Sequence, residues 1–340
     1  MDTCNKSKEK KKQTTLGINW AKIKSKYILR YIFGNLDKKI QLEIIRYNKN
    51  IRDKLNINLN DYIEYPKIEI EIIPVENKNG FFFPCYETLK PYVHIYFNDD
   101  KKEVQRGYLN INDNVSKIKI IIDRQIKTFS NLFGGCDCIE LVNFKKFERK
   151  NIINMAYMFI NCRSLKEINL SNFKTDNVKD MSCMFSECYL LKELDISSFK
   201  MNNVYSMNKM FFLCNSLQRV IFPCTFGKNK LNNMSHMFFG CSSLKELNLT
   251  IFDTSNVNNM NYLFGGCSSL KELDLSNFNT NNVIEMCGMF FGCSSLVKLD
   301  ISNFNTANVD NIIFMFGGCS DKLIKEVKEK NKIKSEAFDL

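Results

Sequence analysis

The sequence lacks the features that mark membrane-spanning chains and most enzymes. No stretch approaches the roughly 18 consecutive apolar residues that a membrane-spanning helix needs, and no uninterrupted apolar segment follows the basic residues near the N-terminus, as a secretory signal would require. We therefore expect a cytoplasmic location, with the cell surface as the alternative. The motifs GxSxG, GxGxxG, HExxH and the phosphate-binding GxxxxGK are also missing. No catalytic residue and no enzymatic activity are expected.

Histidine is scarce, with only His94 and His236 in 340 residues. A zinc site needs ligands that converge from CxxC-type spacing or from paired histidines, and the sequence supplies neither. No metal ligand and no other cofactor are expected. The 14 cysteines do not indicate a disulfide scaffold, because that pattern belongs to short secreted chains. Small buried cysteines are the simpler interpretation.

Net charge is almost absent from most of the chain. The total of +11 is concentrated in residues 1–60, which hold 15 Lys and Arg against 5 Asp and Glu, whereas residues 61–340 hold 33 against 32. A basic tail is expected over residues 1–19. The near-neutral remainder does not support a nucleic-acid surface, so nucleic acid is not an expected partner.

What the chain does have is a repeat of about 26 residues. Eight cysteines recur at intervals of 26 or 27: Cys136, Cys162, Cys188, Cys214, Cys241, Cys267, Cys293 and Cys319. Leucine or a similar residue follows three, six and eight positions after most of them, as with Leu270, Leu273 and Leu275. The last two positions have the period of a strand. One strand of five or six residues per unit, always in the same direction, predicts a parallel sheet along a stack of coils.

After the strand, each unit contains a series of apolar residues that recurs from repeat to repeat. Phe278 and Val283 mark two inward turns, and Met286 and Met289 are followed by Phe290. Their spacing predicts a short helix or a 3₁₀ turn opposite the strand. The expected fold class is therefore α/β, a solenoid over residues 117–320 with a parallel sheet on one face.

This motif resembles the leucine-rich repeats of the BspA-like family, in which Met-Phe, Cys, Ser-Leu, Leu-Asp-Leu-Ser-Asn-Phe and Thr-Asn-Val follow one another. The elements stand between Met289 and Met315, and the resemblance covers residues 129–320. It implies a leucine-rich-repeat solenoid that binds a partner, and, because members are often surface proteins, a surface adhesin as one alternative. One unit departs from the pattern: Pro223 cannot donate to a sheet, so a bulge or loop is expected there.

Residues on either side of the buried strand positions should point outward and form columns on the sheet face. The candidate partner-binding residues are Glu167, Asn169, Glu193, Asp195, Arg219, Ile221, Glu246, Asn248, Glu272, Asp274 and Asp300. The columns are mostly acidic, which favours a protein partner with a basic or polar surface. A solvated face without a ligand is the alternative. Arg219 and Ile221 interrupt the columns, so a specific contact is expected there.

The two ends carry different patterns. Residues 20–60 have helical spacing and resemble an F-box, which implies that Ile28, Leu29, Ile32, Phe33 and Leu36 dock on the adaptor of a cullin ubiquitin ligase; a plain helical cap is the alternative. Residues 61–116 are expected to form a β-rich cap from strands at 68–73 and 92–97, and the strand at 118–122 to begin a degenerate first coil. Residues 321–340 predict a capping helix.

Three functions are therefore open. The chain is expected to be a non-enzymatic protein-binding scaffold that uses the sheet face. The alternatives are the substrate-recognition subunit of a cullin ligase and a surface adhesin. The oligomeric state is left open.

Overall fold

The computed structural model describes residues 23–36, 40–41, 44–45, 48–57, 67–123, 126–147, 149, 151–224, 230–330 and 333–338. The chain divides into two compact units, Met1–Tyr65 and Pro66–Leu340. The predicted basic tail over residues 1–19 lies outside the described residues.

The first unit contains the helices α2 (Lys26–Gly34) and α4 (Lys49–Leu55). Each helix begins at a polar cap, where the side-chain oxygen of Ser25 or Asn48 accepts a hydrogen bond from a backbone N–H of the first turn. Apolar residues at helical spacing face one another across the unit. They form a small core of Leu29, Phe33, Ile45, Ile51 and Leu55.

The second unit begins with an antiparallel sheet. Strand β1 (Ile68–Pro74) pairs with β5 (Ile118–Ile122) on one side and with β6 (Ile139–Lys146) on the other, and β3 (Val93–Phe97) pairs with the free edge of β5. Alternate residues of β1 are buried, as the period of two requires. Between these strands lie the short elements β2 (Gly80–Phe81), α5 (Tyr86–Leu89), η3 (Lys90–Tyr92) and β4 (Tyr108–Leu109).

The expectation that residues 118–122 begin a first coil is wrong. Strand β5 runs antiparallel to both of its neighbours, so it belongs to the sheet that covers the N-terminal end of the stack. The first strand with a coil-like neighbour is β6, which pairs in parallel with β7 (Glu167–Asn169). An isolated run of apolar β-branched residues gives no sign of its direction, which explains the error.

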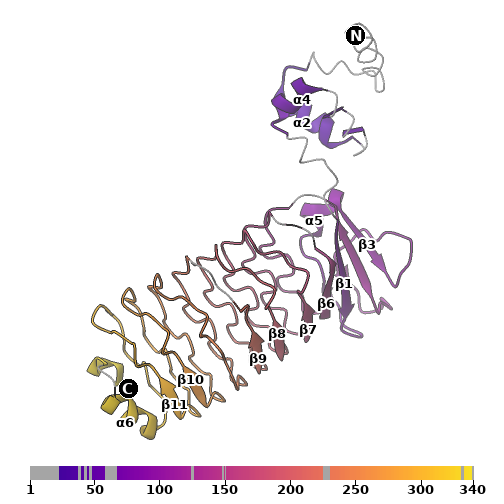
Figure 1. Ribbon diagram of the computed structural model, residues 1–340. Helices are drawn as coiled ribbons and strands as arrows, with labels where there is room; N and C mark the ends of the chain where they lie inside the picture. The colour runs from indigo at the N-terminus through magenta and orange to yellow at the C-terminus, as the bar shows by residue number, and fades with distance from the viewer. Residues whose placement is uncertain are drawn as a thin grey trace. The chain divides into compact units, whose positions relative to one another are not determined.

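From β6 onward, each coil places its strand beside that of the next coil. Strand β8 (Glu193–Asp195) pairs in parallel with β9 (Arg219–Ile221), and β10 (Glu272–Asp274) with β11 (Lys298–Asp300). Figure 1 shows these strands along one side of the stack. Strands β7 to β11 are three residues long, shorter than predicted. The side chain at the strand end turns the backbone, because Asp195 Oδ1 accepts the N–H of Ser197 at 2.8 Å.

The other side of each coil is held by a series of turns that we name the turn ladder. It consists of residues 127–135, 153–161, 179–187, 205–213, 232–240, 258–266, 284–292 and 310–318. Alternate N–H groups donate to carbonyls of the next coil, as Tyr157 N does to Ser182 O at 2.9 Å. The residues between them donate three residues back within their own coil, as Met158 N does to Met155 O.

The predicted short helix or 3₁₀ turn is therefore wrong for these segments. Recurring residues adopt the left-handed conformation, for example Tyr157 with φ 62° and Tyr262 with φ 51°. A left-handed residue interrupts the right-handed run that a helix needs, and it directs the next N–H toward the neighbouring coil. The spacing of three between apolar residues reflects overlapping turns.

Between the two sides lies a core of stacked columns. One column consists of Phe133, Phe159, Phe185, Phe211, Phe238, Phe264, Phe290 and Phe316, with neighbouring ring centroids 5.3 to 5.9 Å apart. Beside it runs the cysteine column, which is fully buried from Cys136 to Cys293. The Sγ of Cys188 donates to Phe159 O at 3.2 Å, and the same carbonyl accepts the N–H of Cys162. Cysteine thus fills the turn, as predicted, and also supplies a hydrogen-bond donor.

The C-terminal end closes the stack. Helix α6 (Asp321–Lys330) buries Leu323 and Val327, and the chain then returns through η4 (Ser335–Phe338). Phe338 stacks on Phe316 at 5.2 Å, and Phe316 N donates to Ala337 O. The end of the phenylalanine column is thereby covered, as the terminal repeat of a stack requires. The assignment of the coils to the leucine-rich-repeat solenoid class stays a prediction.

Candidate binding surfaces

The candidate residues of the strand face are all exposed. We use "strand face" for the outward side chains of β7 to β11 and of residues 246–248. The set comprises Glu167, Asn169, Glu193, Asp195, Arg219, Ile221, Glu246, Asn248, Glu272, Asp274 and Asp300. The parallel register brings them side by side, so that Glu193 lies next to Arg219 and Asp274 next to Asp300. The structure therefore gathers these residues on one surface.

The charges on this face partly neutralise one another. Arg219 Nε lies 3.2 Å from Glu246 Oε1, and Lys298 Nζ lies 3.0 Å from Glu272 Oε2. Both pairs are solvent-exposed, so each adds little to stability. The face is consequently less acidic than the columns alone suggest, since lysine and arginine occupy equivalent positions in neighbouring coils.

The Asp and Asn positions have a structural role that sequence reasoning did not assign. Oδ1 of Asp274 accepts the N–H of Ser276 at 2.9 Å, and Asn248, Asn169 and Asp300 make the same bond to the residue two positions on. The hydrogen bonds from the Ser276 side chain and backbone lower the pKa of Asp274, with a further contribution from Lys298. These residues end the strands, which accounts for their regularity without any ligand.

The irregular unit departs from the regular coils after β9. Within the described residues, β9 pairs with β8, and no strand ladder joins it to residues 246–248; a ladder is likewise absent between β7 and β8 and between residues 246–248 and β10. Residues 225–229, which follow the bulge or loop expected at Pro223, lie outside the described residues. Pro223 is buried and has no N–H to donate, and the Phe222 ring turns inward to pack edge-on against Phe252 at 5.1 Å.

A hollow of about 560 Å³ lies beside the irregular unit. Its apolar lining residues are Val220, Ile221, Phe222, Pro223, Leu247 and Ile251, together with Cys224. Arg219, Glu246 and Asn248 also line it, and about half of the lining surface is polar. Apolar side chains beside a few polar groups are a combination that can receive a side chain of a partner.

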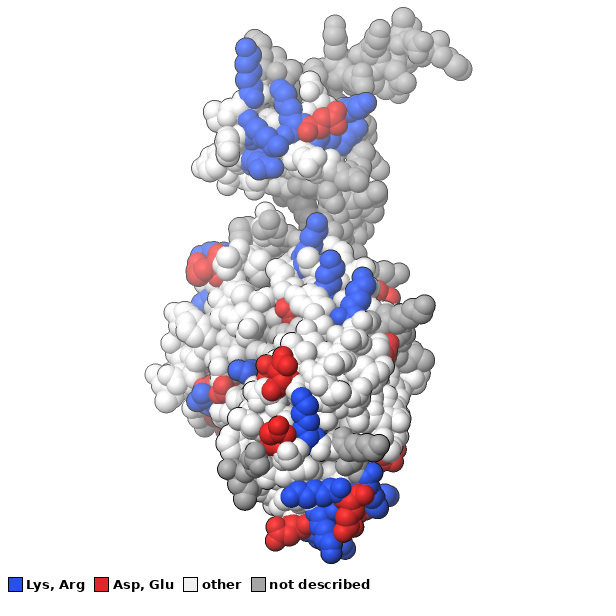
Figure 2. All heavy atoms as spheres, turned by 90° about the vertical axis from the view of Figure 1, so that its left-hand side faces the viewer, with Lys and Arg blue, Asp and Glu red and all other residues white. Residues whose placement is uncertain are grey.

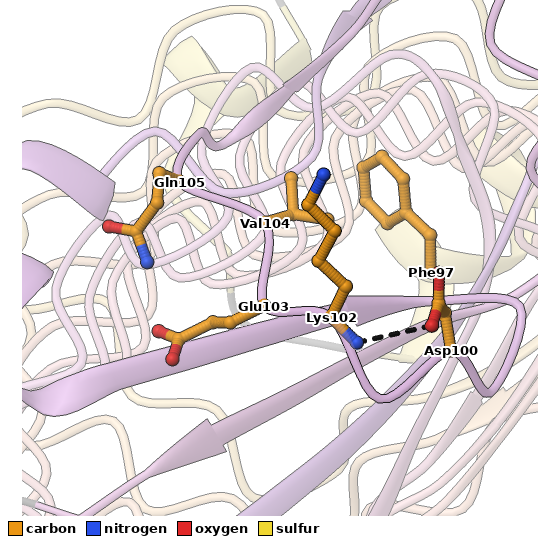
Figure 3. Close-up of a pocket in the computed structure, with 6 residues that line it drawn as sticks. All are labelled: Phe97, Asp100, Lys102, Glu103, Val104 and Gln105. Carbon is orange, nitrogen blue, oxygen red and sulfur yellow. Dashed lines mark hydrogen bonds between the residues drawn. The ribbon is translucent and has the colours of Figure 1, made fainter.

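A second hollow, of about 430 Å³, lies at the turn after β3. It is lined by Phe97, Asp100, Lys102, Glu103, Val104 and Gln105, and Figure 3 shows the backbone N–H of Lys102 bonded to the Asp100 carboxylate. Glu103 Oε1 lies 3.3 Å from His94 Nδ1. The polar groups of this hollow thus bond to neighbouring residues of the turn and of β3, so we do not treat the hollow as a functional site.

Figure 2 faces the C-terminal end of the stack. Charged side chains of both signs gather at its lower end, where α6 lies, and further charged side chains are scattered among uncharged ones above it. Among the described residues, no group of three or more His, Cys, Asp or Glu could hold a metal ion.

Burial raises the pKa of the column thiols, to about 12 for Cys214 and Cys267, which keeps them protonated and poorly nucleophilic.

Of the residues expected to dock on a ligase adaptor, Leu29 and Phe33 are buried in the core of the first unit, and Ile32 and Leu36 are partly buried against it. Ile28 is exposed, at 55%. The helical spacing of these residues thus serves the core of the first unit, and a contact with an adaptor stays an untested prediction.

Sequence reasoning missed an aromatic surface on the turn ladder. Phe212, His236, Phe239, Tyr262 and Phe291, which we name the aromatic stripe, contact one another from coil to coil. The sequence signal for this surface lay in the residues that differ between copies of the repeat. These rings occupy two positions of the turn segment that vary from coil to coil and elsewhere hold residues as different as Gly134, Ile160, Ser186 and Lys209.

The geometry defines a repeat protein built from stacked coils of about 26 residues. The chain belongs to the family described as "Mycoplasma protein of unknown function, DUF285", whose model matches residues 127–245 and 232–335. The searches of curated proteins and of solved structures found no match.

The family match corrects the resemblances drawn from the sequence. The family that matches is this one and not the BspA-like leucine-rich-repeat family, and its match begins at residue 127, which leaves the F-box-like segment over residues 20–60 without support. Leucine, cysteine and phenylalanine recur at this spacing because they pack the interior of a coil, so their recurrence does not identify a family. Among the described residues, no helix is long and apolar enough to cross a membrane.

Proposed function

We propose that the chain is a non-enzymatic protein-binding scaffold, a solenoid of stacked coils whose strand face recognises a protein partner. The observation that carries this proposal is the hollow at the irregular unit, where the exposed Ile221 lies near the Arg219–Glu246 ion pair. Ile221 stands where regular coils have Asp195, Asp274 or Asp300. An exposed apolar residue at a position that is otherwise charged is a typical anchor point for binding.

The strand face on either side of the hollow supports a partner with a basic or polar surface. Glu193 and Asp195 lie on the neighbouring strand β8, in register with Arg219 and Ile221. Asp274 and Asp300 lie side by side on β10 and β11, a like-charge arrangement that a cation from a partner would relieve. An apolar side chain in the hollow, flanked by lysine or arginine, would satisfy both features. The proposed location of this scaffold is the cytoplasm.

The test is quantitative affinity purification with the full chain and two variants. Ile221→Asp introduces the residue that regular coils carry, so folding should be retained, while the apolar anchor is lost. Asp310→Ile replaces an exposed aspartate on the turn side, away from the strand face, and serves as the control. We expect partners that the unchanged chain retains to fall at least tenfold with Ile221→Asp, an anchor loss of about 1.4 kcal/mol or more, and to remain with Asp310→Ile.

Equal recovery with Ile221→Asp would contradict the role of the hollow. The charge of the strand face is tested by Asp195→Lys, which should reduce the recovery of the same partners, because it places a cation where a basic partner would bind. Thermal unfolding of each variant separates a lost contact from a lost fold.

A further inference from the structure

The turn ladder carries bulky residues where the backbone favours glycine. Tyr157, Lys209, His236, Tyr262 and Phe314 have φ between 51° and 62° at equivalent positions of successive coils. A side chain in this conformation costs roughly 1 kcal/mol relative to glycine. Gly288 takes the same position without that cost, with φ 58°. The coil therefore does not need these residues for its own geometry, and their presence calls for another explanation.

Two of these residues, His236 and Tyr262, belong to the aromatic stripe. Phe212 stacks on Phe239 with centroids 5.3 Å apart, His236 stacks on Tyr262 at 5.2 Å, and Tyr262 meets Phe291 edge-on at 6.3 Å. Glycines make room for the rings: a Cβ on Gly288 would lie 2.3 Å from Tyr262, and a Cβ on Gly265 would lie 2.9 Å from Phe239. The rings are thus held in fixed positions against the coils.

The stripe is only partly covered. Phe291 is 44% exposed, and Tyr205 and Ile284 on the same segments are exposed to a similar degree. Fixed, partly exposed aromatic side chains are enriched in protein interfaces.

The same surface carries little charge, and its two charged residues lie in the first and the last of the four segments. The four segments 205–213, 232–240, 258–266 and 284–292 contain only two charged residues, Lys209 in the first and Glu285 in the last. The Lys209 ammonium lies over the Phe212 ring at 5.4 Å. Glu285 Oε2 accepts a hydrogen bond from Asn261 at 3.0 Å. The stripe thus has a positive end, an uncharged aromatic middle and a negative end.

We propose that the aromatic stripe is a self-association surface, at which two copies of this chain pack with their stacks antiparallel about a two-fold axis. This arrangement brings the segment of Lys209 onto the segment of Glu285 of the other copy, and the segment of His236 onto that of Tyr262. Each end then meets the opposite charge, and rings meet rings. Such an isologous contact closes at the dimer.

The dimer is expected to be weak. Neighbouring coils lie about 4.8 Å apart, so the four segments form a short strip. The area of this strip is smaller than the area of about 800 Å² per partner that a standard interface buries. The strand face is not involved, and the proposal is independent of the scaffold function.

The test is sedimentation equilibrium of the full chain at concentrations up to about 0.5 mM. Lys209→Glu and Glu285→Lys should each weaken dimerisation at least tenfold, because each places like charges at both contacts of the two-fold interface. An equimolar mixture of the two variants should recover the dimer, since each copy then meets an opposite charge. Phe291→Ser should weaken it as well. Lys271→Glu, on the strand side, is the matched control and should have no effect.

Three results would overturn the proposal: an unchanged chain that stays monomeric throughout, a dimer that neither charge reversal affects, or a mixture that remains monomeric. Circular dichroism and thermal unfolding of each variant establish that the coils are intact. Recovery in the mixture cannot arise from misfolding, because it requires two chains that are each competent to pair.

Discussion

The two sides of the coil stack are built differently. On the turn side, the hydrogen bonds between coils pass through the irregular unit without interruption: Lys209 N donates to Ser235 O at 3.0 Å, and His236 N donates to Asn261 O at 2.8 Å. On the strand side, the described strands pair two by two, and no ladder joins β7 to β8, β9 to residues 246–248, or those residues to β10. The turn side therefore holds the coils in register, and the strand side tolerates variation.

The difference follows from what lies beneath each side. The turn ladder rests on the phenylalanine and cysteine columns, whose members are buried and hydrogen-bonded from coil to coil. The strand side ends each coil with an exposed polar turn that is satisfied within its own coil. An inserted residue on the strand side breaks a short ladder, whereas the same insertion on the turn side would shift two buried columns. Binding surfaces can vary where such variation costs little stability.

The largest expected effect is the loss of stability at high pH. Burial raises the pKa of the column thiols well above the ordinary value of 9.0, to about 12 for Cys214 and Cys267. The folded chain therefore keeps its thiols protonated, while the unfolded chain ionises them above pH 9. Stability is full below pH 9 and falls as the pH rises toward 12, by roughly 1.4 kcal/mol per thiol at pH 10.

Urea unfolding between pH 7 and pH 10 measures this effect. Cys267→Ala should show a less steep decline with pH than the unchanged chain, by the share of one thiol. A free energy of unfolding that is constant from pH 8 to pH 10 would contradict the thiol column as a source of stability.

The next effect compares the core beneath the two sides. Phe238→Ala removes a fully buried ring from the continuous column and should cost about 3 to 5 kcal/mol of unfolding free energy. Leu247→Ala removes a half-buried side chain that lines the hollow and should cost about 1 to 2 kcal/mol. Chemical denaturation of both variants gives the comparison. Equal costs would show that the two sides support the stack equally.

A smaller effect separates the aromatic stripe from the backbone under it. Both Gly288 and Gly292 have positive φ, but a Cβ would lie 2.3 Å from Tyr262 at the first and 3.6 Å from its nearest atom at the second. Gly292→Ala should cost about 1 kcal/mol for its backbone conformation alone, and Gly288→Ala about 2 to 3 kcal/mol because the ring must move. Thermal unfolding measures both. If the two variants are alike, the ring is not held against the glycine.

The smallest effect belongs to the strand face. Lys298→Ala removes the exposed ion pair with Glu272 and should shift the unfolding midpoint by less than about 2 °C. A shift of more than about 5 °C would mean that the strand face contributes to the stability of the stack, against the division of roles described here.

The sequence predicted most of the coil and little of its chemistry. The 26-residue interval and the alternation of Leu273 and Leu275 located the strands, because a period of two has one structural meaning. The turn side was mistaken for a helix, since apolar residues three apart occur in helices and in overlapping turns alike. Only the left-handed φ of residues such as Tyr262 distinguishes them, and that angle is not encoded by residue type when the residue is not glycine.

The candidate sites show the same limit. The exposure of Glu193 and Asp274 was predicted from alternation, and the importance of Ile221 from its departure from the repeat. The hollow beside Ile221 depends on how two neighbouring coils separate, which no single unit reveals. The aromatic stripe joins residues about 26 positions apart, so it becomes visible only when the coils are stacked.

Amide hydrogen exchange of the native chain tests the division between the two sides most directly. We expect the N–H groups of Tyr157, Cys183, Lys209, His236 and Tyr262, which bond to the next coil, to exchange only on global unfolding, in the irregular unit as in the others. The N–H groups of residues 246–248 should exchange much faster. Early exchange at Lys209 and His236, or equal protection on both sides, would contradict a stack that is held in register by its turn ladder.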